Sequence, residues 1–313
     1  MRYVLKKTAT MLITLLAVSL FLFVSFQLIS GDPATRMLGT GATPERLEAL
    51  REELGLNDAL LVRYVRWLAS FVRGDPGISY VYRQPVASLL GAKIPVTLAL
   101  ALMSFALTCL VGFPAGLYTA KYAGSALDRI VMVLNQAIMA VPPFFAGILI
   151  SWAFGTVLRL FSPGAYVSYE TSVPRFLGYL VFPSIALALP RAAQLAKLLR
   201  GAILEESGKN YARTAYSRGN NTDGVLFGHL LKNAFLPVLT FLGMSLANLL
   251  AGSLIVESIF NIPGISSILL SSIGNRDYPV ILAAVMWIAV FIIAINLLVD
   301  ILYAVLDPRI DGE

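Results

Sequence analysis

The sequence predicts an all-α polytopic membrane protein with six transmembrane helices and a small helical extracytoplasmic domain between helices 1 and 2. Two properties of the whole chain support this fold class. Of its 313 residues, 58% are hydrophobic and 13% are charged, whereas soluble domains carry about a quarter charged residues. The third observation is the distribution of charge, which leaves several uncharged runs long enough to cross a bilayer. Together these properties exclude a soluble enzyme.

Five uncharged runs are long enough to span the membrane, at residues 8–31, 94–120, 130–158, 233–256 and 278–299. Each reaches across about 30 Å of hydrocarbon at about 1.5 Å per residue. A sixth helix is expected at residues 176–199. It would carry Arg191, Lys197 and Arg200 toward the aqueous side. Prolines inside the spans predict kinks, because each removes a helical hydrogen bond; they are Pro114, Pro142, Pro143, Pro183 and Pro190.

The first run follows basic residues, as the apolar region of a secretory signal would. It is longer than such a region and has no small-x-small cleavage site before Gly31, so we expect it to remain as an anchor. Lys and Arg gather in the N-terminal tail and at residues 121–129 and 191–232. The positive-inside rule places these segments in the cytoplasm. With six spans, both termini are then cytoplasmic.

The expected division of the chain has three parts. Residues 1–30 form the N-terminal tail and first span, residues 31–93 the extracytoplasmic helical domain, and residues 94–313 the core, with a cytoplasmic loop at about 201–232. Within the outer domain, Thr43-Pro44-Glu45 opens one helix that Gly55 closes. A second helix runs from Leu60 to Val72, and one face of it is predicted to hold Leu61, Tyr64, Val65, Leu68 and Phe71.

The residues of the chain offer little for chemistry. It has one cysteine, Cys109, and one histidine, His229, too few for a zinc or copper site, so no metal site is expected. Neither HExxH nor a phosphate-binding Gly-x-x-x-x-Gly-Lys-Ser/Thr loop occurs, so we expect no catalytic residue and no cofactor on this chain. Glu257 and Asp300 lie at or near span ends, which disfavours an ion-coupled carrier. Any uphill transport would need an ATPase on another chain.

Residues 205–237, called the elbow below, form the most specific segment. They predict a helix, a Gly-Asn-Asn turn at residues 219–221, and a second helix that continues into the next span. Three side chains at the turn are able to cap the second helix; they are Asn221, Thr222 and Asp223. Gly219 indicates either a positive φ or close approach of a partner. A basic loop that only obeys the positive-inside rule is the simpler alternative.

Arg213-Thr214-Ala215-x-x-x-Gly219 resembles the "EAA" loop of bacterial ABC importer permeases, in the form used by the dipeptide, oligopeptide and nickel branch. The resemblance covers nearly the whole chain. The other segments that resemble the first permease of that branch are Gly31-Asp32-Pro33-Ala34, Leu50-Arg51-Glu52, Leu54-Gly55-Leu56, Gly74-Asp75-x-Gly77-x-Ser79, Pro85-Val86, Pro95-x-Thr97, Phe260-x-x-Pro263-Gly264, residues 275–280 and Asp307-Pro308-Arg309.

The resemblance implies a multi-pass permease subunit of an ATP-driven importer in the bacterial inner membrane. It implies a second homologous permease, two cytoplasmic ATPase subunits that hold ATP and Mg²⁺, an extracytoplasmic binding protein and the lipid bilayer as partners, and no nucleic acid. The residues expected to couple to the ATPases are Tyr211, Arg213, Thr214, Ala215, Gly219, His229, Asn233 and Pro237.

Short peptides are the expected substrate, with nickel or a metal chelate as the alternative. A stand-alone secondary transporter or channel is an alternative of a different class, and an intramembrane enzyme is a third. The sequence does not identify the residues that line the pathway.

Overall fold

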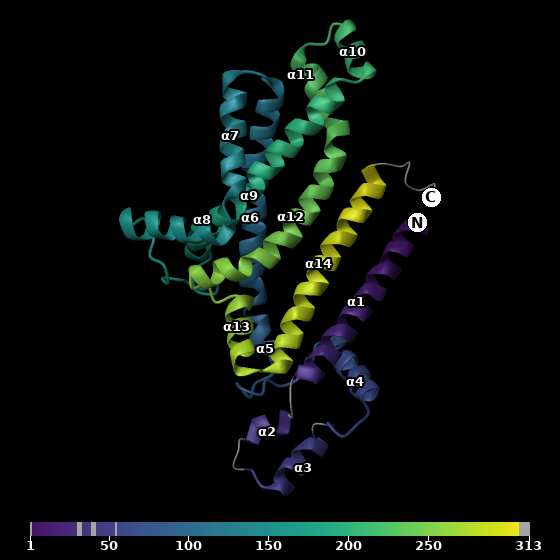
Figure 1. The fold of residues 1–313 in the computed structure, drawn as a ribbon, viewed down its shortest axis with the longest axis vertical. Helices are drawn as coiled ribbons and strands as arrows, with labels where there is room; N and C mark the ends of the chain where they lie inside the picture. Colours follow the sequence, from purple (N-terminus) through teal and green to yellow (C-terminus); the bar gives the residue numbers. More distant parts are fainter. Residues whose placement is uncertain (1, 30–32, 39–41, 54, 307–313) are drawn as a thin grey trace. The chain divides into compact units, whose positions relative to one another are not determined.

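The computed structural model describes residues 2–29, 33–38, 42–53 and 55–306. Gly31, Asp32, Leu54 and the Asp307-Pro308-Arg309 motif lie outside the described residues. The regular elements of the described residues are helices joined by loops (Figure 1). They are α1 Arg2–Ile29, α2 Pro33–Leu38, α3 Pro44–Glu53, α4 Leu60–Val72, α5 Val86–Gly91, α6 Ile94–Lys121, α7 Ala126–Ala140, α8 Pro143–Ile150, η1 Ser151–Val157, α9 Val173–Ser207, α10 Asn210–Ser217, α11 Thr222–Val225, η2 Leu226–Leu230, α12 Leu231–Ile259, α13 Ile265–Asn275 and α14 Tyr278–Leu306.

The predicted fold class is confirmed. Within the described ranges, five helical segments are long and apolar enough to cross a membrane, and a bent pair gives up to six. The five are Leu5–Gln27, Val86–Lys121, Val173–Ser207, Thr222–Ile259 and Tyr278–Tyr303. The expected helix at residues 176–199 is therefore present and extends further in both directions.

The run at residues 130–158 is not one straight span, contrary to the expectation. Ala126–Ala140 and Pro143–Val157 meet at an angle of 98°. Pro142 and Pro143 explain the break, because proline has no N–H to donate and disfavours the α conformation of the residue before it. Val141 accordingly has φ −84° and ψ 118°, and Pro143 occupies the first turn of α8, where the missing N–H costs nothing.

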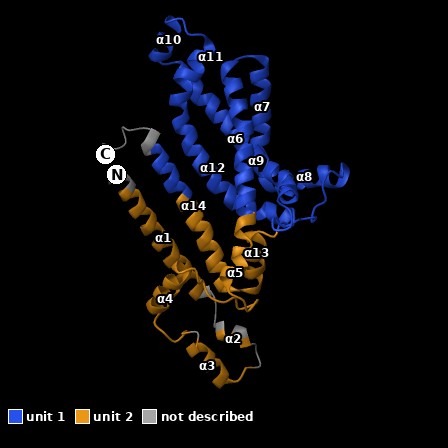
Figure 2. Cartoon of the chain, turned by 180° about the vertical axis from the view of Figure 1, so that it is seen from behind, with its two compact units in different colours: residues 1–3, 97–262, 295–313 blue, residues 4–96, 263–294 orange. Residues whose placement is uncertain are grey.

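Two compact units divide the chain, coloured separately in Figure 2. Unit 1 comprises residues 1–3, 97–262 and 295–313, and unit 2 comprises residues 4–96 and 263–294. The expected division at residues 30 and 93 separates parts of the chain by the side of the membrane on which they lie. The two compact units are defined by packing alone, so they do not test this division.

In unit 1, the long helix α9 packs against α7, α8 and α12. It also lies close to α6 at two glycines. A Cβ on Gly112 would lie 2.8 Å from Leu195, and one on Gly116 would lie 3.0 Å from Leu199. Small residues at these positions let the two backbones approach, as is usual for membrane helices.

In unit 2, α4 packs on α1 through a polar contact at the middle of α1. The hydroxyls of Tyr64 and Ser19 lie 2.8 Å apart, and both residues are buried. The helix Leu60–Val72 has the predicted bounds. The face that holds Leu61, Tyr64 and Val65 is only partly buried, because Leu61 and Val65 are 69% and 57% exposed. Aromatic side chains make the contact instead: Trp67 packs against Phe23 of α1.

Candidate functional site

The elbow has the predicted helix-turn-helix form. Helix α10 ends before Gly219, which has φ +85°. A Cβ added there would meet nothing within 4 Å, so the glycine is explained by its backbone conformation. Asn221 begins the next helix, since its side chain accepts a hydrogen bond of 2.8 Å from the Gly224 amide. Of the three proposed capping residues, Asn221 is therefore the cap.

An apolar cluster holds the elbow in unit 1. Ala212 and Ala215 of α10 are 0% and 5% exposed. They join buried residues of α9, α11, η2 and α12, including Leu199, Ile203, Val225, Leu226, Leu230 and Ala234. Small side chains on α10 let it pack closely onto this cluster. In Figure 1, α10 and α11 lie beyond the adjoining ends of α9 and α12.

The structure separates the predicted coupling residues into two groups. Six of them are exposed, namely Arg213, Thr214, Gly219, His229, Asn233 and Pro237, while Tyr211 is half-buried. Ala215 differs, because it is buried inside the chain's own apolar cluster. Contact with another subunit is therefore open to the exposed residues, while Ala215 supports the position of α10.

Tyr211 is held at the base of α10. Its hydroxyl donates a hydrogen bond of 2.5 Å to Glu206, and the ammonium of Lys209 lies 2.6 Å from the same carboxylate. Burial and the hydrogen bond to Glu206 raise the pKa of the Tyr211 hydroxyl, and a hydrogen bond with Asn233 acts in the opposite direction. Two predicted residues, Tyr211 and Asn233, thus belong to one polar contact between the ends of α10 and α12.

Two ion pairs join the elbow and the adjoining part of α9 to neighbouring helices. Lys121, at the end of α6, lies 2.7 Å from Asp223 of α11. Arg200 of α9 donates two hydrogen bonds of 2.7 Å to Asp128, which is 2% exposed and lies in the first turn of α7. The second pair is bidentate, a geometry that fixes orientation as well as distance. Sequence analysis missed both, because the partners are far apart in the chain.

A second polar centre, in unit 2, was also missed. Asp277 is fully buried and accepts hydrogen bonds from the Ser79 hydroxyl and from the backbone amides of Tyr80, at 3.0 Å, and Val81, at 3.4 Å. Burial and the nearby Asp277 carboxylate raise the pKa of the Tyr80 hydroxyl, opposed by Arg63. Two of the motif segments quoted above, at residues 74–79 and 275–280, therefore meet at one carboxylate.

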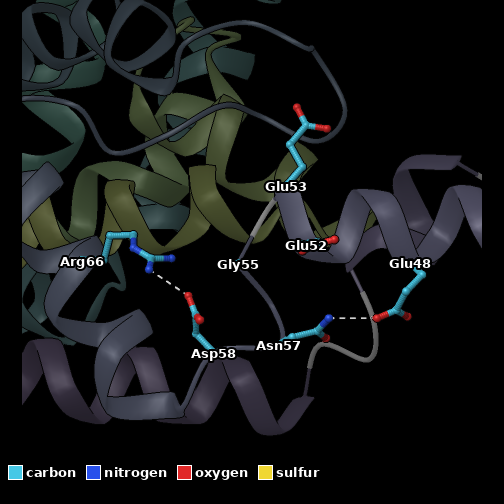
Figure 3. A pocket seen from close by; sticks show the side chains of 7 residues that line it. All are labelled: Glu48, Glu52, Glu53, Gly55, Asn57, Asp58 and Arg66. Carbon is cyan, nitrogen blue, oxygen red and sulfur yellow. Dashed lines mark hydrogen bonds and ion pairs between the residues drawn. The ribbon is translucent and has the colours of Figure 1, made fainter.

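Unit 2 also has an acidic hollow of about 480 Å³ beside α3 (Figure 3). Arg66 pairs with Asp58 at 2.8 Å, and the Asn57 amide donates to Glu48 at 2.9 Å. Glu52 and Glu53 complete the acidic lining. The hollow is thus negatively charged, and two of its carboxylates, Asp58 and Glu48, already have partners within the lining.

The helical, multi-pass architecture defines an integral membrane protein, and comparison with known proteins gives its family. Residues 112–312 match the family described as binding-protein-dependent transport system inner membrane component, and residues 1–101 match the N-terminal part of such components. The chain belongs to this family. It is thus a multi-pass inner-membrane component of a transport system that works with a binding protein. The resemblance to ABC importer permeases is confirmed.

Similar proteins match over almost their whole length. A probable peptide ABC transporter permease protein of Sinorhizobium fredii is 34% identical over 308 residues, 98% of each chain. A putative peptide transport system permease protein of Brucella abortus is 36% identical over 307 residues, 98% of each chain. An oligopeptide transport system permease protein of Bacillus subtilis is 34% identical over 312 residues, 99% of each chain.

Proposed function

We propose that this chain is the permease subunit of an ATP-driven importer of short peptides, which forms the translocation pathway together with a second, homologous permease. The observation that supports peptides is the near full-length similarity to three permeases that are named for peptides. The same names favour peptides over nickel or a metal chelate. An extracytoplasmic binding protein delivers the peptide in this proposal.

Uptake by cells tests the substrate. A strain that lacks this chain should lose accumulation of a labelled tripeptide and regain it when the gene is restored. Accumulation of labelled nickel should be unchanged by the deletion. Loss of nickel uptake with normal tripeptide uptake would reject the peptide assignment.

The exposed residues of the elbow are the proposed contact with two cytoplasmic ATPase subunits. ATP and Mg²⁺ are held by those subunits in this proposal, so the purified chain alone should show no saturable ATP hydrolysis. Arg213 is the sharpest probe, because it is exposed next to the buried Ala215. Arg213→Glu reverses its charge without entering the apolar cluster.

Co-purification measures this contact. With a tag on this chain, Arg213→Glu should recover at least about tenfold less ATPase subunit than the wild type, which corresponds to about 1.4 kcal/mol of binding free energy. The matched control is Arg73→Glu, the same change at an exposed arginine in unit 2. Equal recovery from both variants and the wild type would contradict the proposed contact.

We further propose that both termini and the elbow face the cytoplasm. Cys109, half-buried in α6, is the single cysteine of the chain, so Cys109→Ala gives a thiol-free background. Ser79 is too buried for labelling. Exposed Glu52 and Asn220 are better sites. An impermeant thiol reagent should label Glu52→Cys from outside intact cells and Asn220→Cys only after the membrane is opened. Labelling of both in intact cells would reject this orientation.

A further inference from the structure

Helix α9 carries a polar stripe that neither the apolar core nor the elbow uses. Arg191, Gln194 and Lys197 recur every third residue, so they share one side of the helix. Arg191 and Gln194 are half-buried and Lys197 is exposed. The opposite side is buried against the rest of unit 1 and consists of small and apolar residues, among them Ala192, Ala193, Leu195, Ala196 and Leu199.

Arg191 lies inside the candidate membrane span Val173–Ser207, and its spacing from Arg200 indicates a position deeper in the membrane than the aqueous side expected from the sequence. The bidentate Asp128–Arg200 pair stands where the uncharged run of α7 begins, and so marks one edge of the hydrocarbon. Arg191 precedes Arg200 by nine positions on the same helix, which places it about 14 Å further into the membrane at about 1.5 Å per residue. On its other side, α9 is uncharged back to Phe176.

Neutral groups are the partners of both cations in the stripe. The Arg191 guanidinium donates to the Gln194 amide oxygen at 3.0 Å, and the Lys197 ammonium donates to the Gln136 amide oxygen of α7 at 3.1 Å. Within the described residues no carboxylate pairs with either one. A guanidinium at this depth is costly against lipid, so it faces protein or a water-filled cavity.

We propose that the stripe of Arg191, Gln194, Lys197 and Gln136 lines the translocation pathway, and that Arg191 binds the free C-terminal carboxylate of a passing peptide. This inference rests on the proposed function. A guanidinium matches a carboxylate with two parallel hydrogen bonds. Gln194 positions the guanidinium and leaves its charge unneutralised, so the peptide carboxylate completes the pair. A carboxylate of the second permease is the competing occupant.

Transport by the complete importer in proteoliposomes separates the two occupants. One peptide is supplied in two forms, with a free C-terminal carboxylate and with a C-terminal amide, and each variant is compared with the wild type for each form. Arg191→Gln should lower uptake of the free acid roughly tenfold, as expected for loss of one charge-assisted pair, and change uptake of the amide less than about twofold. Uptake of the free acid by Arg191→Lys should lie between that of the wild type and that of Arg191→Gln. Arg129→Gln removes an exposed arginine outside the stripe and should change the uptake of neither peptide form.

Water access provides an independent measurement. In the Cys109→Ala background, Arg191→Cys should react with a water-soluble thiol reagent, and saturating peptide should slow that reaction. Leu110→Cys is the control: Leu110 is an apolar position of α6 that is 70% exposed in the single chain. We expect it to face lipid, so its thiol should stay unreactive.

Equal loss of both peptide forms in Arg191→Gln, or an Arg191→Cys thiol as unreactive as that of Leu110→Cys, would overturn the proposal and point to the second permease. Failure of the proposed function is a different result: the wild-type importer would then move neither peptide form. In that case the thiol measurement alone would decide whether Arg191 faces water, and an unreactive thiol would still overturn the pathway assignment.

Discussion

The elbow and the loop at residues 74–85 hold their shapes by opposite means. In the elbow, small apolar side chains are buried, so that Ala215 is 5% exposed while its neighbours Arg213 and Thr214 are exposed. In the loop, the buried contact is polar: the Ser79 hydroxyl and the Tyr80 amide donate to the buried Asp277 carboxylate, while the apolar Ile78 is 60% exposed. The exposed Arg213 and Thr214 side chains of the elbow are therefore available to another subunit, whereas the groups around Asp277 are already used within the chain.

The largest expected effect comes from placing a charge in the elbow's apolar cluster. Ala215→Glu should lower the free energy of unfolding by roughly 3 to 5 kcal/mol, because an uncompensated carboxylate is buried. The control is Arg213→Glu, which adds the same side chain at an exposed position and should stay within about 0.5 kcal/mol of the wild type. The fraction of protein that survives heating in detergent measures both. Equal survival of the two variants would mean that α10 does not pack as described.

Removal of the Asp277 carboxylate, which holds the loop at residues 74–85, is expected to have the next largest effect. Asp277→Ala leaves the Ser79 hydroxyl and the Tyr80 amide without their acceptor, which should cost about 3 kcal/mol. Asp277→Asn keeps one acceptor oxygen and should lose less. The midpoint of thermal unfolding in detergent distinguishes them, and an unchanged midpoint for Asp277→Ala would show that the carboxylate does not hold the loop.

The turn of the elbow should respond more weakly. Gly219 has φ +85° in open space, so Gly219→Val is opposed only by backbone strain, at about 2 kcal/mol. Gly219→Asn should lose less, since asparagine tolerates positive φ. Both free energies follow from thermal unfolding. If the valine variant matched the asparagine variant, the strain would have been relieved by a change in the turn.

The smallest effect is expected at the helix cap. Asn221→Ala removes the acceptor for the Gly224 amide and should cost about 1 kcal/mol. Asn221→Asp keeps an acceptor in place and should be nearly neutral. Hydrogen exchange at the start of α11 measures the loss directly, and unchanged exchange in the alanine variant would remove Asn221 as the cap.

Local signals predicted the features that depend on nearby residues. Uncharged runs located α1, α6, α12 and α14, because a helix in lipid must satisfy its own backbone hydrogen bonds and so needs a continuous apolar segment. The turn at Gly219 was predicted, and Asn221 was one of three residues proposed as the cap, because both features depend on residues within one helical turn. The proline pair at residues 142 and 143 predicted a kink, although the uncharged run at residues 130–158 suggested a single span.

What the sequence by itself determined was the class of protein and the order of its helices, through composition and short-range pattern. The tertiary structure alone decided which side of each helix is buried. It exposed Leu61 and Val65 but buried Ala215, and it joined Ser79 to Asp277 and Arg200 to Asp128 across long stretches of chain. Periodicity shows that two residues share a face, but burial depends on which other helix covers that face. That choice is made by packing between segments whose separation in sequence carries no local signal.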